Sequence, residues 1–226
     1  VNDLKELVEI HDLNRTTSLM IAAKNKKLST FEIYWNFTER ILNESIGFKK
    51  LLTAEDSHYE TILHYASSNK DQNTFKFVVD NYEKILTKNE IRTMILKFNH
   101  DFYPFYFTVI EKSSANTTSE LSNFLKSTFD EEKSALQEFL SIRNREGESV
   151  FSKFKNIKET AEKFEIFSKL MNSTFDDHSK LNEIWDSIGF ATRMEAFFTN
   201  QKSFSKNDLQ NLKNSAWNQK DFEYLI

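Results

Sequence analysis

The chain has 226 residues, a formal net charge of −4 and 28% charged residues of both signs, so it lacks the basic field that holds nucleic acid. Its three Gly, one Pro and no Cys count against hairpin-rich folds and exclude disulfides, thiolate metal sites and Gly-rich phosphate loops. Aromatic residues make up 14% of the chain, including 22 Phe, which provides apolar surface for a packed core rather than a disordered coil.

The sequence repeats itself with a period of about 44 residues. The segment TSLMIAAKN at 17–25 aligns with TILHYASSN at 61–69. Three apolar ladders keep this period, and their members are Leu19, Leu63, Phe105 and Phe151; Phe31, Phe75, Leu121 and Phe164; and Leu51, Ile95, Phe139 and Ile184. A fixed period of this length predicts that each copy is one structural unit. We place the copies at 12–55, 56–97, 98–143 and 144–188, with 189–226 as a degenerate repeat or cap of a single repeat domain spanning 1–226.

Within each copy the apolar residues recur at i, i+3, i+4 and i+7, which predicts helices. In chain order we expect helices near 19–25, 31–42, 75–86, 89–96, 131–140, 164–171 and 176–185, with a further short helix ending at Leu51. Capping boxes are predicted at Ser29 with Glu32, Thr87 with Glu90, Thr117 with Glu120 and Thr128 with Glu131. Because two or three amphipathic helices cannot bury an apolar face alone, the copies are expected to stack as an all-α helical-repeat solenoid.

The joint between copies resembles the ankyrin repeat, whose pattern is D-x-x-G-x-T-P-L-H-x-A. Residues 56–66 read D-S-H-Y-E-T-I-L-H-Y-A, and residues 12–22 read D-L-N-R-T-T-S-L-M-I-A. The third copy keeps Pro104 and the fourth keeps Gly147. The resemblance covers roughly 12–185 and implies short inter-repeat hairpins. Since the ankyrin period is about 33 residues, it also implies an extra helix in each repeat. An armadillo or HEAT-like solenoid is the alternative, and it would lack the hairpins at 12–17, 56–61 and 144–149.

The ankyrin resemblance implies a non-catalytic scaffold that binds a protein partner through its hairpin tips and the concave surface of its first helices. Carried over by alignment, the tip residues are Leu13, Asn14, Thr16, Ser57, His58, Glu60, Asn99, His100, Phe102, Arg145, Glu146 and Glu148. The first-helix residues are Lys24, Asn25, Ser68 and Asn69. An aromatic side chain at a tip suits a partner anchor, so Phe102 is expected to contribute most of the binding energy. By the same resemblance, His64 ties the hairpin to the helix through hydrogen bonds.

Catalysis has weaker support in the sequence. His58 and His100 lie beside Asp56 and Asp101, but the chain has no HxxxH or HExxH spacing that would predict a metal site. The acidic runs at 130–132 and 176–177 open predicted helices, where negative charge suits the helix dipole. We therefore predict no enzyme, no cofactor and no metal, although an all-helical enzyme stays an alternative.

The cellular setting is predicted only broadly. The sequence has no apolar run long enough to span a membrane and no apolar core of a signal peptide at its start. We expect a cytoplasmic protein. Five N-x-[ST] sequons leave secretion or delivery into a host open. The start at Val1 without Met suggests a second hypothesis, in which the chain is the targeting segment of a larger multidomain effector or toxin with its catalytic domain elsewhere.

Overall fold

The computed structural model describes residues 2–42, 46–69, 71–98, 105–143, 147 and 160–176. These residues are helical and contain no strand, so the all-α prediction is confirmed. None of their helices is long and apolar enough to span a membrane. The helices are α1 (Asn2–Glu9), α2 (Ser18–Asn25), α3 (Leu28–Leu42), α4 (Ile46–Leu52), α5 (Ile62–Ser67), α6 (Asn73–Ile85), α7 (Lys88–Ile95), α8 (Phe105–Lys112), α9 (Ala115–Thr128), α10 (Lys133–Leu140) and α11 (Thr160–Thr174). The chain divides into two compact units, Val1–Asp130 and Glu131–Ile226.

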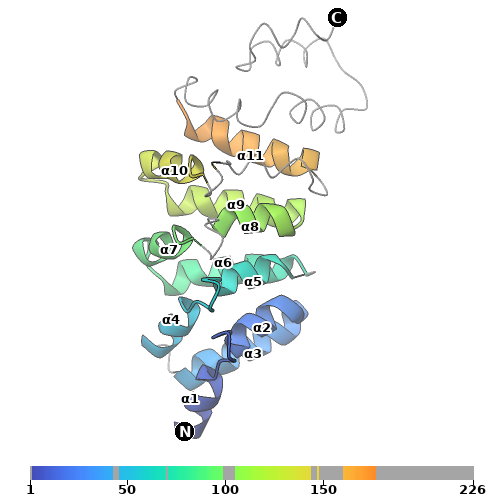
Figure 1. Cartoon of the computed structure of the whole chain (residues 1–226), viewed down its shortest axis with the longest axis vertical. Coiled ribbons are helices and arrows are strands. Elements are labelled where there is room, and N and C mark those ends of the chain that lie inside the picture. Colours follow the sequence, from blue (N-terminus) through green and yellow to red (C-terminus); the bar gives the residue numbers. More distant parts are fainter. Residues whose placement is uncertain are drawn as a thin grey trace, which may run out of the picture. The chain divides into compact units, whose positions relative to one another are not determined.

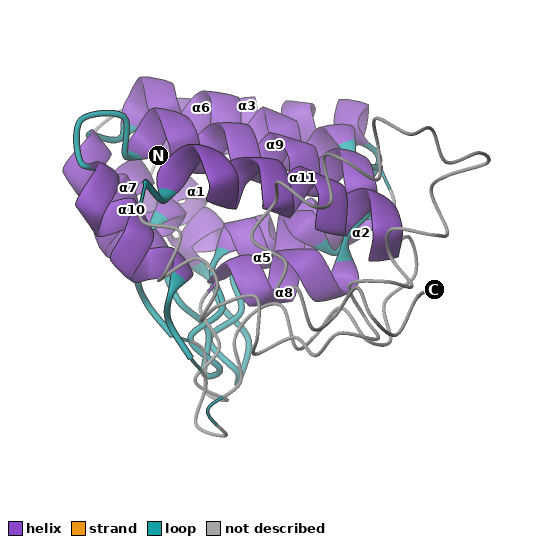
Figure 2. Ribbon diagram, turned by 90° about the horizontal axis from the view of Figure 1, so that it is seen from above, coloured by secondary structure: helices purple, strands orange, loops and turns teal. Residues whose placement is uncertain are grey.

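The first unit arranges its helices in two layers. In the first layer α2 packs against α5 and α5 against α8, and in the second layer α3 packs against α6 and α6 against α9 (Figure 1). Each helix of the first layer also packs against the next helix in the sequence, which belongs to the second layer (Figure 2). The short helices α4 and α7 flank the second layer, α4 against α3 and α7 against both α6 and α9. Helices that are one period apart in the sequence are therefore neighbours within this unit.

Two of the apolar ladders run through the core of the first unit. Each described member is buried on its own helix: Leu19, Leu63 and Phe105 in the first layer, and Phe31, Phe75 and Leu121 in the second. Full burial of such a side chain contributes roughly 1.5–3 kcal/mol, so the ladders hold the layers together. The side chains of Phe151, Phe164 and Ile184, which continue the ladders in the sequence, lie outside the described part of the chain.

An aromatic cluster joins the first copy to the second. Phe31 and Trp35 of α3 lie with their ring centroids 5.8 Å apart, and Phe77 of α6 lies 5.6 Å from Phe31 and 5.5 Å from Trp35. Phe48 of α4 completes the cluster at 5.3 Å from Trp35. All four contacts are edge-to-face, the arrangement that the ring quadrupoles favour.

In each of the first three copies, the short third helix buries three apolar residues at i, i+3 and i+4. These triads are Phe48, Leu51 and Leu52 on α4; Ile91, Met94 and Ile95 on α7; and Leu136, Phe139 and Leu140 on α10. The described members of the third ladder thus lie in the core, as expected. The Tyr82 hydroxyl of α6 also donates a hydrogen bond to the Leu52 carbonyl at the end of α4, at 2.6 Å, so the next copy closes the open end of this helix.

A polar joint links α7 to the end of α9. Arg92 Nε donates to the Thr128 carbonyl oxygen at 3.0 Å, and the Arg92 guanidinium lies 5.4 Å from the centre of the Phe129 ring. Lys88 forms an ion pair with Asp130 at 2.6 Å. The exposed ion pair contributes little to stability, whereas the Arg92 contact satisfies a carbonyl that the helix leaves open.

The second unit contains the same joint one period later, between α10 and the end of α11. Gln137 Nε2 donates to the Thr174 carbonyl oxygen at 2.8 Å, and Lys133 pairs with Asp176 at 2.7 Å. The two helices also pack against each other. An amide thus replaces the guanidinium of the first unit, and the hydrogen bond to the carbonyl is preserved.

The predicted helix starts are partly right. The capping box at Thr87 is confirmed, because Thr87 N–H donates to Glu90 Oε2 at 2.7 Å and Glu90 N–H donates to Thr87 Oγ1 at 3.2 Å. The box at Thr128 is wrong, because α9 continues through Thr128.

The capping boxes predicted at Ser29 and Thr117 are also wrong, because each helix begins at an earlier residue. Helix α3 begins at Leu28, ahead of Ser29, and its first N–H donates to Asp71 Oδ2 at 3.1 Å. The N-cap of α9 is Ser114, which accepts from the Thr117 N–H at 3.2 Å.

Candidate functional site

Two described loops have the same hydrogen-bond frame. We call residues 12–17 the first loop and residues 56–61 the second loop. Oδ1 of the leading aspartate accepts from the N–H groups two and four residues later, at 2.9 and 2.8 Å for Asp12 and at 2.8 and 2.9 Å for Asp56. The N–H of each aspartate also donates to the carbonyl four residues on, at 3.1 Å in both loops. The frame is therefore encoded locally, by an aspartate that bonds its own backbone.

The fourth residue of each loop has left-handed backbone geometry. Both Arg15 and Tyr59 have a φ of 61°, a region that non-Gly residues rarely occupy. Gly147, their counterpart in the fourth copy, has a φ of 76°. These are the positions at which the ankyrin pattern has Gly, so the alignment places the turn correctly. Apart from Gly147, the hairpin predicted at 144–149 lies outside the described residues.

The two loops are joined to each other. The Ser57 N–H donates to the Asn14 carbonyl oxygen at 2.7 Å, and the first loop is closed at its base by an antiparallel bridge between His11 and Thr17. The predicted turns at 12–17 and 56–61 are thus present and in register with each other. A backbone hydrogen bond between loop tips fixes their relative position without using side chains.

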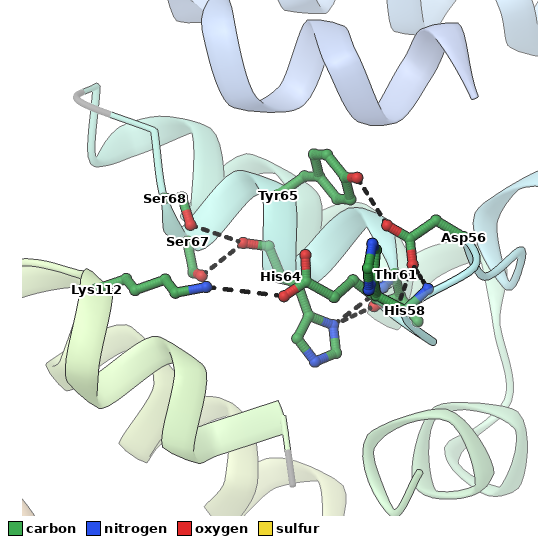
Figure 3. Close-up of polar contacts among 9 residues, drawn as sticks. Asp56, His58, Thr61, His64, Tyr65, Ser67, Ser68 and Lys112 are labelled. Atoms are coloured by element: carbon green, nitrogen blue, oxygen red, sulfur yellow. Dashed lines mark hydrogen bonds and ion pairs between the residues drawn. The ribbon is translucent and has the colours of Figure 1, made fainter. Parts of the chain in front are cut away.

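His64 fastens the second loop to α5. Its Nδ1 accepts from the Thr61 N–H at 3.0 Å and lies 3.1 Å from the Thr61 hydroxyl (Figure 3). Since an amide N–H only donates, Nδ1 is unprotonated and the ring carries its hydrogen on Nε2. Burial of the side chain, with a smaller contribution from the Lys112 ammonium, lowers the pKa of His64 to about 3. The predicted structural role of His64 is confirmed by these bonds.

The second loop is also tied to α5 and α8 by charged groups. The Tyr65 hydroxyl donates to Asp56 Oδ2 at 2.8 Å, and Lys112 of α8 lies 3.8 Å from a carboxylate oxygen of Glu60 (Figure 3). Burial, together with the neighbouring carboxylates, raises the pKa of Tyr65 to about 12. Tyr65 therefore stays a hydrogen-bond donor throughout the physiological pH range.

The predicted contact residues differ in accessibility. Leu13 is fully exposed. The other exposed members of the set are Asn14, Lys24, Asn25, Ser57 and His58, and the half-buried members are Glu60, Ser68 and Asn69. Asn99, His100, Phe102, Arg145, Glu146 and Glu148 lie outside the described residues. The candidate surface thus consists of the two joined loops and the exposed end of α2.

Two predicted contact residues have internal roles instead. Thr16 is only 7% exposed, and Thr17 after it is 5% exposed, because the loop turns inward where it meets α2, so we remove Thr16 from the candidate surface. The Asn69 amide donates to the carbonyl oxygens of Ala23 and Lys26, at 2.6 and 2.8 Å. Asn69 belongs to the next copy, and it thereby provides hydrogen-bond donors for the carbonyl groups at the end of α2. We correct its assignment from a partner contact to a structural link.

Sequence reasoning missed one residue of this surface. Tyr59 is an exposed aromatic side chain on the second loop. Alignment treated it only as the residue that replaces the ankyrin Gly. The clue was available, since a bulky residue at a position that requires a positive φ is rare and is a reason to examine the residue. Each of the joined loops thus has one exposed apolar side chain, Leu13 on the first loop and Tyr59 on the second.

A second candidate is an open groove of about 620 Å³ between α4 and α7. Its lining includes Lys49, Lys50 and Lys97, whose positive charge would attract an acidic ligand. Lys49 pairs with Glu90 at 3.3 Å and Lys97 pairs with Glu55 at 2.5 Å. These carboxylates offset most of the positive charge, so the groove favours an acidic ligand only weakly.

Metal-binding geometry is missing from the described residues, since no three His, Asp or Glu side chains there lie close enough together to hold an ion. No family model matches the chain, and comparisons with curated proteins and with solved structures find no match either. Function is therefore argued from the loops and helices themselves.

Proposed function

We propose that the chain is a non-catalytic scaffold of ankyrin-like repeats, each with an extra helix, and that it binds a protein partner through its loop tips. Three features support the stacked arrangement within the first unit. Like helices pack on like helices, the ladder residues are buried, and polar contacts join residues about one period apart.

The loops favour an ankyrin-like array over an armadillo or HEAT-like one. Armadillo and HEAT repeats join helix to helix without a hairpin, whereas the first and second loops here are turns with one hydrogen-bond frame. The threonine and histidine of the ankyrin pattern are paired at the start of α5, where Thr61 and His64 bond to each other. This pairing is the role that the resemblance implies for the two residues.

The single observation that carries the binding proposal is the bond between the loops, from Ser57 N–H to the Asn14 carbonyl. Because the loops are ordered before any partner arrives, little conformational entropy is lost on docking. The exposed Leu13 and Tyr59 side chains are suited to act as anchors, since a few apolar or aromatic residues usually carry most of the binding energy.

Site-directed photo-crosslinking tests this proposal. A benzophenone amino acid is placed at Leu13 and, in a matched control, at the exposed position Arg40 on the outer side of α3. We expect one discrete protein adduct from position 13 and none of the same mass from position 40. The captured protein is then purified, and Leu13→Ala with Tyr59→Ala should weaken its affinity about tenfold or more. Equal crosslinking at both positions, or unchanged affinity, would contradict the proposal.

A further inference from the structure

The groove between α4 and α7 is formed by the third helices of two successive copies. These helices lie one above the other along the first unit (Figure 1). Each is held by the core, since α4 packs against α3 and α7 packs against α6 and α9. The walls of the groove are therefore fixed by packing, and its volume of about 620 Å³ lies within the range of ligand sites.

Most of the surface that lines the groove is apolar. Met94 of α7 contributes to this surface and is only 3% exposed. The methylene groups of lysine side chains add further apolar surface below their charged ends. An apolar lining with a small number of polar groups is the usual composition of a ligand site.

Two ion pairs connect the walls of the groove. Lys49 Nζ of α4 lies 3.3 Å from Glu90 Oε2 of α7, and Lys97 after α7 lies 2.5 Å from Glu55 Oε1 after α4. Glu90 also accepts from the N–H and the hydroxyl of Thr87, at 2.7 and 2.9 Å. These bonds, together with Lys49, lower the pKa of Glu90. Glu90 therefore stays ionised at neutral pH and keeps Lys49 paired.

The third lysine of the groove, Lys50 of α4, lacks an acidic partner. Its side chain is exposed, and no ion pair joins it to a carboxylate among the residues that the structure describes. Since Lys49 and Lys97 are both paired, Lys50 supplies the net positive charge of the groove. One carboxylate balances this charge, whereas a ligand with several negative charges would also be repelled by Glu55 and Glu90.

The uncharged polar groups of the groove suit a peptide main chain. Thr53 Oγ1 donates to the Lys49 carbonyl oxygen at 3.0 Å, and Thr93 Oγ1 donates to the Asn89 carbonyl oxygen at 2.8 Å. Because each hydroxyl has a single hydrogen, its oxygen is left to accept from a ligand. The Asn89 carboxamide, which also lines the groove, can both donate and accept. An extended peptide presents N–H and C=O groups alternately and can match both kinds of partner.

We propose that the groove between α4 and α7 binds a short extended segment of a partner protein, and that an aspartate or glutamate of this segment pairs with Lys50. The lining residues run from Asn89 to Lys97 along α7, a helix of 8 residues and so about 12 Å long. About four extended residues fit along this length. One acidic side chain among them gives charge complementarity without displacing either ion pair. The groove shares no residue with the joined loops, so this site is independent of the proposed function.

The probe is a short capped peptide with one glutamate among alanines, titrated into the isotope-labelled full chain and followed by NMR. The amide signals of Lys50, Thr53 and Thr93 should shift in a saturable manner. Lys50→Gln should weaken the affinity about fivefold, because it removes the ion pair with the peptide. The Lys50 side chain is exposed, so thermal melts of the variant should match those of the unchanged chain. A peptide with glutamine in place of glutamate should bind the unchanged chain equally poorly.

The matched control is Lys84→Gln, which removes an exposed lysine of α6 that does not line the groove and should leave peptide binding unchanged. Sodium acetate tests whether a carboxylate alone is sufficient, and it should bind far more weakly than the peptide. The inference would be overturned by an absence of saturable shifts, by equal weakening in Lys84→Gln, or by acetate that binds as tightly as the peptide. Groove signals that shift with the concentration of the chain alone would also overturn it, since a second copy would then be the occupant. Failure of loop-tip binding would bear on the proposed function and leave this result intact.

Discussion

The first and second loops have one backbone frame in two different surroundings. Asp12 organises its loop at the exposed surface, whereas Asp56 makes the same bonds at 2% exposure and receives a third from the Tyr65 hydroxyl. The residue that caps the following helix differs as well. In the second loop the cap is His64, and in the first it is Met20, whose sulfur lies 3.4 Å from the Thr17 nitrogen.

This difference shows that two loops with the same hydrogen-bond frame can contribute very differently to the stability of the protein. The hydrogen-bond frame needs only a leading aspartate and a fourth residue with left-handed backbone geometry, and both loops have them. The contribution of the loop to stability depends on how deeply its polar groups are buried, and neighbouring copies provide that burial. The second loop has neighbours on both sides, and its polar groups are satisfied internally. Among the described residues, the first loop bonds to another loop on one side only, and its Leu13 side chain is fully exposed.

The largest expected effect comes from removing the two aspartates one at a time. Asp56→Ala should lower the free energy of unfolding by about 3 kcal/mol, because it leaves two N–H groups and the Tyr65 hydroxyl without their buried acceptor. Asp12→Ala should cost clearly less, since water replaces an exposed carboxylate. Urea unfolding followed by circular dichroism measures both. Equal losses would show that burial does not distinguish the two loops.

An effect of intermediate size is expected from pH. The neutral form of His64 is favoured in the folded state, where its pKa is about 3 rather than 6.5. Its contribution is therefore complete above pH 6.5 and is lost as the pH falls toward 3. Between pH 6.5 and 5 the free energy of unfolding should drop by about 2 kcal/mol, near the limit of about 1.4 kcal/mol per pH unit. Urea midpoints at several pH values give this slope.

Two variants sharpen the pH experiment. His64→Met gives the second loop the cap residue of the first, so the slope between pH 6.5 and 5 should flatten. His58→Gln changes an exposed histidine of the same loop and should leave the slope as it was. A slope that survives His64→Met would mean that other groups titrate with folding.

The smallest effect concerns the left-handed residues. Tyr59→Gly should raise the free energy of unfolding by about 0.5 kcal/mol, because relief of the positive φ outweighs the extra chain entropy of Gly. Gly147→Ala makes the reverse change at the same loop position and should lower it by about 1 kcal/mol. Nothing lies within 4 Å of a Cβ built at Gly147, so backbone geometry alone would act. A destabilised Tyr59→Gly would show that the tyrosine ring packs.

The sequence was sufficient for features that depend on local chemistry. Helix α7 was predicted with its cap, because Thr87 and Glu90 bond to each other within one turn. The buried ladders were predicted because one period carries the same core through successive helices. The loop turns were predicted from the resemblance to the ankyrin pattern, which begins at Asp12 and Asp56, and in the structure these aspartates bond their own backbone.

Features that depend on contacts between residues far apart in the sequence could not be predicted from local patterns. The start of α3 depends on Asp71, which is 43 residues away along the chain. Asn69 is of a polar residue type that usually lies at the surface, yet its amide donates hydrogen bonds to carbonyl oxygens at the end of α2.

The spacing of the polar joints bears on how such a chain can change length in evolution. Asn69 reaches back to Ala23, Arg92 reaches forward to Thr128, and Gln137 reaches forward to Thr174. Duplication or loss of one whole period keeps a donor opposite a suitable acceptor at each such boundary. An insertion of half a period would break the bonds on both sides. Genes of this kind should therefore grow and shrink in whole steps.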